Sequence, residues 1–384
     1  MLLKKISKIT ITIITIFFFL PLSSVHAANI NNTFINLGKK YGLPLNKEVF
    51  CFYNYYGRVA GYNDSNNVRV IPASVSKLYT FDFALNKLGK DFRYTTNVFL
   101  NGNTLYINGG GDPHFVIENL RSIIEKVSTD KHILISHFVF SPNFYFNWKT
   151  SPSDVTYSMI ISLKEDSGAP INPNFSVHYS PTPYYGGGIK YKFQSAPLHM
   201  LMKQTSNWSN NFTADTLFDK AGGSRAFSAY MKKMYGASNQ IVRFGTGSGL
   251  SSNYTTCGLT IRVMKHLEQT VNSLGIGIFN VMSVPRVDPG VLKDAFPIIS
   301  NTSDIVAKSG TLDYHHNYAG IAYTTAGPIY FAVFSGYTKM KDKSKSKIFA
   351  ETFIGSLINR YTQYTFKYIP HNYVTENTKI IPRN

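Results

Sequence analysis

The sequence predicts an α+β fold in which both ends of the chain build one domain and the middle builds a smaller one. Segments near each end alternate as strands do, and they are flanked by segments whose apolar residues recur at helical spacing. The block between them changes character, with a hairpin, a helix and a loop-rich stretch of its own. Hydrophobic residues make up 43% of the 384 residues and charged residues only 16%, so a disordered chain is excluded.

The N-terminal part of the main domain begins with a predicted hairpin. Residues 47–63 are rich in aromatic residues and are interrupted by Gly57, which favours a strand, a turn and a second strand. Pro72 then marks the entry to a helix that starts at Ala73. Its apolar residues keep helical spacing until Gly89, which is expected to end it.

The middle block and the C-terminal half follow in order. Residues 92–140 predict two strands joined by a hairpin turn, then a helix and another strand, and residues 148–190 predict loops. Several helices are expected between residues 196 and 275. A run of antiparallel strands at residues 305–336 and an amphipathic helix at residues 344–363 complete the chain.

The first 27 residues have the pattern of a secretory signal peptide. Lysines and no acid precede an apolar run that is broken by Pro21, and Val25 and Ala27 occupy the positions that a signal peptidase reads. An uncleaved membrane anchor is the alternative, which the short, proline-broken run disfavours. We therefore expect cleavage after Ala27 and export to the periplasm or cell envelope.

The net charge limits the expected binding partners, and the two cysteines bear on disulfide formation. The formal charge of +18 favours attraction to anionic envelope polymers and leaves association with a membrane surface open. Nucleic acid is not expected, because no recognition motif is present and export removes that partner. Cys51 and Cys257 could pair in an oxidising compartment or stay free and buried, and the sequence leaves both open.

A serine and a lysine lie one helical turn apart at the start of the helix after Pro72. A serine hydroxyl needs a base within hydrogen-bond reach, and residues i and i+3 share a helix face, so Lys77 can serve Ser74. A lysine acts as a base only when burial or nearby positive charge lowers its pKa. The same spacing recurs at 128–131 and 344–347 among charged neighbours, so the apolar context is what singles out Ser74.

Two further short motifs could complete a site. Ser209 and Asn211 form a Ser-x-Asn turn, which can relay a proton and hold a substrate carbonyl, although this pattern has decoys elsewhere in the chain. Lys308-Ser309-Gly310-Thr311 lies on a predicted strand, where the lysine supplies positive charge for a carboxylate and helps to depress the pKa of Lys77. Gly310 permits close approach of a backbone, and Thr311 offers a backbone N–H.

In this order the three motifs resemble those of penicillin-binding proteins and class A β-lactamases. The chain resembles most the D-alanyl-D-alanine carboxypeptidase/endopeptidase family, the low-molecular-mass class C penicillin-binding proteins. The resemblance rests on "PASVSKLYT", "LYINGGGDP", "SNWSNNFTADTL", "GTGSGLS" and "VAKSGTLDYHHNYAG", and it covers about residues 30 to 360.

The resemblance implies a serine β-lactamase/transpeptidase-like domain, an antiparallel sheet flanked by helices, formed by residues 28–90 and 191–384. Residues 91–190 would be the inserted, smaller α+β domain. The reaction would be cleavage of the terminal D-Ala-D-Ala bond of peptidoglycan stem peptides through an acyl-serine, with cleavage of D-amino-acid cross-bridges as a second activity. β-Lactams would be covalent inhibitors, and no metal or cofactor is implied.

Carried over residue by residue, the resemblance implies that Ser74 is the nucleophile and Lys77 its general base. Ser209 would pass the proton to the leaving amine, and Asn211 would bind the substrate amide. Lys308 would sit near Ser209 and the substrate carboxylate. The third motif, with Ser309 and Gly310, would line the substrate, and the backbone N–H groups of Ser74 and Thr311 would form the oxyanion hole.

The sequence also departs from the family pattern. Asn210 stands where Asp is common, Asp215 stands for a later Glu, and no Asp precedes Gly247. His315 and His316 follow the third motif, where we expect loop histidines rather than a metal site. The interval from Ser74 to Ser209 is shorter than in the family's long form, which suggests one inserted domain kept and another lost.

Two alternatives remain. A class A β-lactamase would have a shorter interval and a suitably placed Glu between the first two motifs, which Glu118, Glu125 and Glu165 do not supply. A catalytically degenerate envelope protein that binds peptidoglycan without cutting it is the more serious rival. All side chains needed for acylation are nevertheless present.

Overall fold

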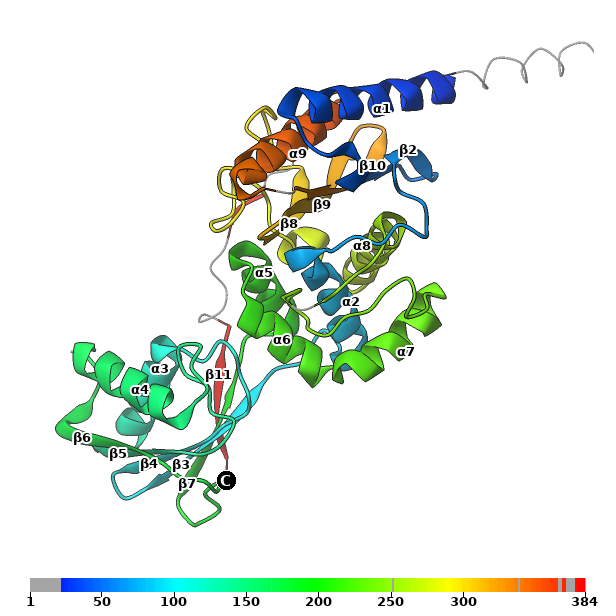
Figure 1. Ribbon diagram of the computed structural model, residues 1–384. Coiled ribbons are helices and arrows are strands. Elements are labelled where there is room, and N and C mark those ends of the chain that lie inside the picture. The colour runs from blue at the N-terminus through cyan, green and yellow to red at the C-terminus, as the bar shows by residue number, and fades with distance from the viewer. Residues whose placement is uncertain are drawn as a thin grey trace, which may run out of the picture.

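The computed structural model describes residues 22–166, 168–250, 252–337, 339–364, 368–370 and 377–383. The chain forms two units, each with its own sheet (Figure 1). The apolar run of the expected signal peptide lies outside the described residues, and the expected cleavage site at Ala27 falls within the first turns of helix α1. Among the helices that the structure describes, none combines the length and hydropathy needed to cross a membrane.

The main domain is organised around a five-stranded antiparallel sheet with the order β2-β1-β10-β9-β8. Its strands are β1 (Glu48–Tyr53), β2 (Arg58–Tyr62), β8 (Ile305–Leu312), β9 (His315–Thr324) and β10 (Gly327–Gly336). β1 pairs with β10, with Cys51 opposite Ala332, so the two ends of the chain meet inside one sheet. The predicted hairpin and the predicted C-terminal strands are confirmed.

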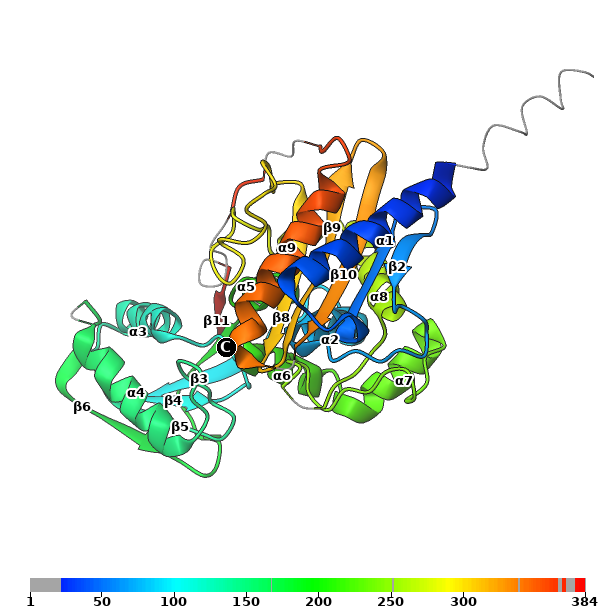
Figure 2. The same cartoon turned by 45° about the horizontal axis from the view of Figure 1, so that its top comes forward.

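One face of this sheet is covered by α1 (Leu22–Tyr41) and α9 (Lys343–Ile358), which lie alongside each other (Figure 2). Phe34 of α1 packs against Phe50 of the sheet and against Phe349 and Phe353 of α9, with ring centroids 4.5 to 5.1 Å apart. Aromatic rings therefore fill the layer between the two helices and the sheet.

The other face is covered by α2 (Ser76–Leu88) and α8 (Cys257–Ser273), with α5 (Leu198–Trp208), α6 (Asn211–Lys220) and α7 (Gly223–Tyr235) packed beyond them. Short 3-10 turns complete the domain: η1 (Leu45–Lys47), η2 (Ala73–Val75), η3 (Ile278–Asn280) and η4 (Met340–Asp342). Cys51 and Cys257 form a disulfide that ties β1 to the first residue of α8. Such a link across 206 residues constrains the unfolded chain and is worth about 2 to 5 kcal/mol.

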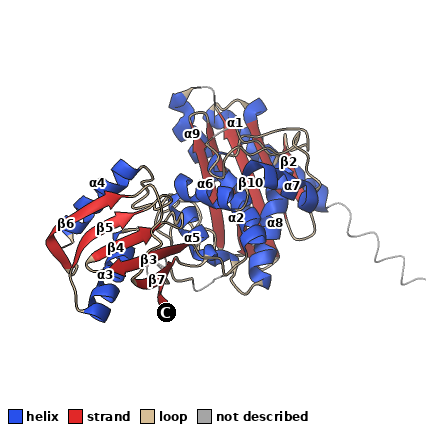
Figure 3. Ribbon diagram, turned by 90° about the horizontal axis from the view of Figure 1, so that it is seen from below, coloured by secondary structure: helices blue, strands red, loops and turns tan. Residues whose placement is uncertain are grey.

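The inserted unit is a second α+β domain, as expected. Its six-stranded sheet has the order β11-β7-β3-β4-β5-β6, and Figure 3 shows its helices and strands beside the main domain. The elements are β3 (Thr95–Asn101), β4 (Thr104–Asn108), α3 (Ile117–Lys131), β5 (Ile135–Phe140), α4 (Pro152–Glu165), β6 (Ile171–Tyr179), β7 (Ile189–Gln194) and β11 (Lys379–Arg383). β4, β5 and β6 run parallel, whereas the other pairs are antiparallel.

The expectation of loops at residues 148–190 is wrong, because α4 and β6 occupy most of this stretch. Ser151 caps α4 by accepting a hydrogen bond from the Asp154 N–H, and Pro152 occupies the first helical turn. Val155, Met159 and Leu163 bury one face of this helix. These capping and periodicity signals are present in the sequence, but the scattered Pro, Ser and Gly residues around them favoured loops.

The C-terminal end of the chain returns to the inserted domain. β11 pairs with β7, with Ile380 opposite Phe193, so the expectation that this segment belongs to the main domain is wrong. The expected boundary at residue 190 also falls inside β7. The inserted sheet therefore extends to Gln194 and includes residues 379–383. Arg93 stabilises this return by donating hydrogen bonds to the carbonyl oxygens of Ser195 and Asn377.

Candidate active site

The nucleophile candidate lies in a tight turn at the entrance to α2. Pro72 precedes the 3-10 turn η2, and Ala73 takes a left-handed conformation with φ of 49°. Gly310 of β8 packs directly against this turn, because a Cβ there would lie 2.4 Å from the Pro72 carbonyl oxygen and 3.1 Å from the Ser74 nitrogen. We expected the missing side chain of Gly310 to leave room for a substrate backbone. In the structure it leaves room for the turn that carries Ser74.

Lys77 is the buried base candidate, with no exposed side-chain surface. Its Nζ donates hydrogen bonds to Ser74 Oγ at 2.8 Å, to Asn211 Oδ1 at 2.7 Å and to the Ser248 carbonyl at 3.2 Å. All three acceptors are neutral. Burial lowers the pKa of Lys77 to about 7, with the nearby carboxylate of Asp215 acting in the opposite direction.

Ser209 and Lys308 form the second half of the site. Ser209 ends α5 in a left-handed conformation with φ of 52°, and Lys308 Nζ donates to its Oγ at 3.0 Å and to the Ser309 carbonyl at 2.8 Å. Burial, and then repulsion from Lys77, lower the pKa of Lys308 well below its usual value. Burial is the larger cause at both lysines. Charge repulsion between their two amines is mutual, so the expected influence of Lys308 on the pKa of Lys77 stays a prediction.

Asn211 begins α6 and joins the two halves of the site. Asn210 caps this helix, its side-chain oxygen accepting a hydrogen bond from the Thr213 N–H at 2.9 Å. Asn is as good an N-cap as Asp, so the departure at this position leaves the helix start intact. The Asn211 carbonyl oxygen accepts from Lys77, and its amide nitrogen is not used in that contact.

The segment at residues 245–250 supplies a contact that the motifs alone did not reveal. Asp215 accepts hydrogen bonds from the Ser248 N–H at 2.7 Å and from Ser248 Oγ at 3.0 Å, which fixes the carbonyl that faces Lys77. Asn253 holds the same loop by donating to Ser76 Oγ and to the Thr246 carbonyl. The similarity of "GTGSGLS" to the family segment was the signal for this loop, but no spacing rule connects it to Lys77.

The far end of the third motif is more open. Thr311 is exposed, and its hydroxyl lies 3.2 Å from Nδ1 of His316. His315 and His316 belong to β9 rather than to a loop, and burial lowers the pKa of His316 to about 4. Within the described ranges, no three His, Cys, Asp or Glu side chains are grouped as metal ligands.

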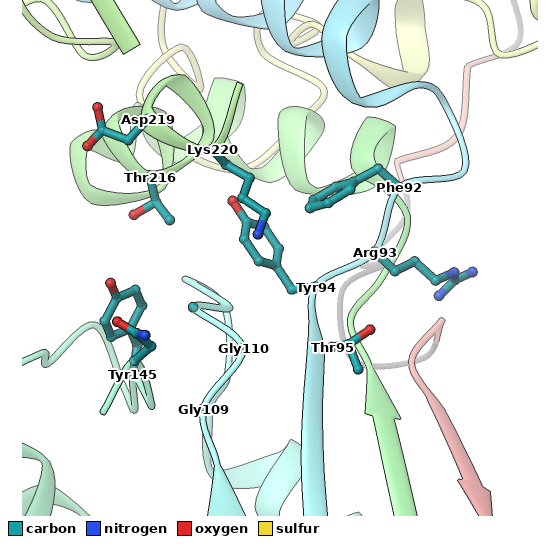
Figure 4. A pocket seen from close by; sticks show the side chains of 12 residues that line it. Phe92, Arg93, Tyr94, Thr95, Gly109, Gly110, Tyr145, Thr216, Asp219 and Lys220 are labelled. Atoms are coloured by element: carbon teal, nitrogen blue, oxygen red, sulfur yellow. The ribbon is translucent and has the colours of Figure 1, made fainter. Parts of the chain in front are cut away.

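The inserted domain contacts α6 at the residues that directly follow the second motif. His114 is partly buried, and its Nε2 lies 3.1 Å from Thr213 Oγ1 on α6, while Tyr145 packs edge-on against Phe212. Beside these contacts lies a cavity of about 600 Å³, which Thr216 and Lys220 of α6 line on one side and Tyr94 and Tyr145 of the inserted unit on the other (Figure 4). The helix that presents Asn211 is therefore braced by the inserted domain.

Comparisons with known families agree with this geometry. The model of the β-lactamase enzyme family matches residues 171–362, half of the chain, and that of the D-Ala-D-Ala carboxypeptidase 3 (S13) family matches residues 58–132. The family resemblance and the transpeptidase-like fold expected from the motifs are confirmed. No curated protein sequence matches the chain.

Solved structures share the fold at low sequence identity. Bd3459, a predatory peptidoglycan endopeptidase from Bdellovibrio bacteriovorus, is 21% identical with a TM-score of 0.72, over 87% of this chain and 98% of that one. Bd0816 from the same organism, in complex with immunity protein Bd3460, is 23% identical with a TM-score of 0.70, over 84% and 95%. Penicillin binding protein 4 (dacB) from Haemophilus influenzae is 18% identical with a TM-score of 0.62, over 86% and 99%.

Proposed function

Because the chain belongs to the β-lactamase enzyme family, we propose that it is a serine-type DD-peptidase acting on peptidoglycan stem peptides. It would remove the terminal D-Ala of a D-Ala-D-Ala end, and cleavage of D-amino-acid cross-bridges would follow the same chemistry. One observation carries the proposal: the Lys77 amine is buried, has a pKa of about 7 and donates to Ser74 Oγ at 2.8 Å. At neutral pH a large fraction of this amine is uncharged and able to accept the serine proton.

Acylation would begin with substrate binding across β8. The terminal carboxylate would approach Lys308, whose lowered pKa would rise again beside the negative charge, so binding is coupled to proton uptake. The Asn211 amide nitrogen would hold a substrate carbonyl. Ser74 Oγ then attacks the carbonyl carbon of the penultimate D-Ala as its proton passes to Lys77 Nζ. The oxyanion is stabilised by the backbone N–H groups of Ser74 and Thr311.

Collapse of the tetrahedral intermediate breaks the peptide bond. The proton held by Lys77 passes through the Ser209 hydroxyl to the leaving nitrogen, so D-Ala departs as a neutral amine and Lys77 becomes neutral again. A water then attacks the acyl carbon, giving its proton to Lys77, and Ser74 Oγ leaves with that proton. The roles of Lys77 and Ser209 rest on their hydrogen bonds to Ser74 and Lys308.

The location of this reaction is also a proposal. The N-terminal sequence favours export to the periplasm or cell envelope, and the Cys51–Cys257 disulfide favours an oxidising compartment. The strongly basic chain would be attracted there to anionic polymers and membrane surfaces. Detection of the protein in periplasmic extracts, with Ala28 as its first residue, would test this.

A fluorescent penicillin tests the chemistry against the rival, a degenerate binding protein. The structural neighbour Bd3459 has been observed acylated by penicillin G. We expect covalent labelling of the wild-type chain, complete loss in Ser74→Ala, and no effect of Ser344→Ala, the serine of a decoy Ser-x-x-Lys pair. A folded wild-type protein that is never labelled by the penicillin would support the degenerate binding protein. Mass spectrometry of digested peptidoglycan then distinguishes loss of one D-Ala per stem from loss of cross-linked muropeptides.

A further inference from the structure

We propose that the inserted domain carries a separate carbohydrate-binding site for one sugar ring. The site is the cavity at the carboxyl ends of β4, β5 and β6. This inference rests on the proposed function for the identity of the ligand, a glycan strand of peptidoglycan. The cavity has a volume of about 160 Å³, small for a pocket that encloses a drug-sized molecule and suited to a single ring.

The position of the cavity is the first argument. Asn108 ends β4, Ser141 follows β5 and Ser180 follows β6, and these three strands are parallel neighbours in the inserted sheet (Figure 3). Because these strands are parallel neighbours, their carboxyl ends meet at one edge of the sheet, and the segments that follow them converge on this cavity. The inserted domain therefore has a second candidate site, on a sheet distinct from that of Lys308.

The chemistry of the walls is the second argument. Tyr106, Tyr184 and Tyr185 line the cavity together with amide and hydroxyl side chains, and none of its lining residues is charged. In a chain with a formal charge of +18, an uncharged lining argues against a carboxylate or phosphate ligand. A sugar ring matches such walls, because its C–H face lies against the negative face of an aromatic ring while its hydroxyl groups hydrogen-bond at the edges.

The rigidity of the rim is the third argument. Asn108 holds the loop before β7 with two hydrogen bonds, its Nδ2 donating to the Tyr184 carbonyl and its Oδ1 accepting from the Tyr184 N–H. The Tyr184 ring is stacked on Tyr106 at 3.8 Å, and its hydroxyl donates to the Gly187 carbonyl. A loop fixed in this way is pre-organised, so that little conformational entropy is lost on binding.

Tyr185 is the residue that this rigid loop presents. Its side chain is 83% exposed, and in the described part of the chain it has no hydrogen bond or ring contact. Thr182 is exposed next to it, and Tyr179 is partly exposed at the end of β6. A tyrosine on a fixed support offers a large amphipathic contact area at a low cost in conformational entropy. We therefore assign Tyr185 as the platform for the sugar ring.

Calorimetric titration of the full exported chain carrying Ser74→Ala tests the site without turnover. The probes are peptide-free glycan strands, prepared by amidase treatment of peptidoglycan, and chitotetraose, which is neutral and so excludes simple charge attraction. We expect both to bind, with affinity reduced about tenfold or more by Tyr185→Ala and retained within about twofold by Tyr185→Phe. Tyr157→Ala, which removes a 70% exposed tyrosine of α4, should leave the affinity unchanged.

Three results would overturn the proposal: no binding of either glycan, equal affinities for the parent and Tyr185→Ala, or an equal loss in Tyr157→Ala. Penicillin labelling of Ser74 separates this failure from failure of the proposed function. Glycan binding without penicillin labelling would support the sugar site and contradict the proposed peptidase activity. Labelling without glycan binding would support the peptidase activity and contradict the sugar site.

Discussion

Two buried lysines of the main domain differ in one respect that decides what each can do. Lys77 donates to three neutral acceptors in the described part of the chain: Ser74 Oγ, Asn211 Oδ1 and the Ser248 carbonyl. Lys203 on α5 is equally buried, but its Nζ lies 2.5 Å from the Asp288 carboxylate and also donates to two carbonyl groups. Burial lowers the pKa of Lys77 to about 7 and that of Lys203 to about 8.

The difference teaches that burial alone does not make a base. A lysine paired with a carboxylate loses that pairing when it loses its proton, so Lys203 is suited to hold the chain together. Through Asp288, Lys203 joins α5 to the segment that follows η3. In that segment the Val291 N–H donates to the carbonyl of Asn207, which lies two residues before Ser209. Among the described residues no carboxylate contacts Lys77, so releasing or accepting a proton costs it little and occurs next to the serine that needs it.

Substitution by arginine should give the largest difference between the two lysines. Arginine keeps the charge but cannot lose its proton. Lys77→Arg should slow acylation by penicillin by about a thousandfold or more, which is within the range for removal of a general base. Lys203→Arg should leave the acylation rate within a few-fold of wild type. The measurement is the second-order rate constant of labelling, and comparable rates for both variants would contradict the assignment of Lys77 as the base.

Substitution by methionine should affect Lys203 more than Lys77 when the free energy of unfolding is measured. Lys203→Met leaves the buried Asp288 carboxylate without its cation, which typically costs about 3 to 5 kcal/mol. Lys77→Met leaves only neutral acceptors unpaired, at about 1 to 3 kcal/mol, and removes a costly buried amine. Denaturant unfolding of the two variants should therefore show the larger loss at Lys203. A larger loss at Lys77 would mean that its amine serves stability first.

The smallest effect should be a shift of the pH profile. Only the neutral Lys77 amine is a base, so acylation should rise with pH and reach half of its maximum near pH 7. Asp215 stabilises the charged form of Lys77, so Asp215→Asn should move this midpoint to lower pH. The asparagine side chain keeps an oxygen that can accept the hydrogen bond that the Ser248 N–H now donates to Asp215. The rate of β-lactam acylation against pH measures this, and a midpoint shifted upward would be inconsistent with the proposed coupling.

The sequence predicted those parts of the site that depend on local spacing. Ser74 and Lys77 are one helical turn apart, and Lys308 to Thr311 follow one another on a strand, so each motif forms wherever its element forms. Similarly, the strands and helices with clear periodicity were found, including α2 with Gly89 after its last residue. The family resemblance supplied the order of the motifs and, with it, the expectation that they converge.

What the sequence did not predict depends on contacts between distant segments. The Ser248 carbonyl reaches Lys77 only because Asp215 on α6 fixes its loop, and no local pattern records that pairing. The addition of β11 to the inserted sheet and the pairing of Cys51 with Cys257 have the same origin. Burial was named as a possible cause of a lowered pKa at Lys77, but its extent is a property of the packed domain rather than of the motif.

The central claim is that the Lys77 amine of the free protein loses its proton near neutral pH, and NMR titration measures this directly. The chain would carry ¹³C at the ε carbon of lysine, with signals assigned by Lys77→Arg and Lys203→Arg. We predict a lysine signal that titrates near pH 7 and disappears in Lys77→Arg. A Lys77 signal that keeps its charged-state shift up to pH 10 would contradict the claim and remove the general base from the proposed mechanism.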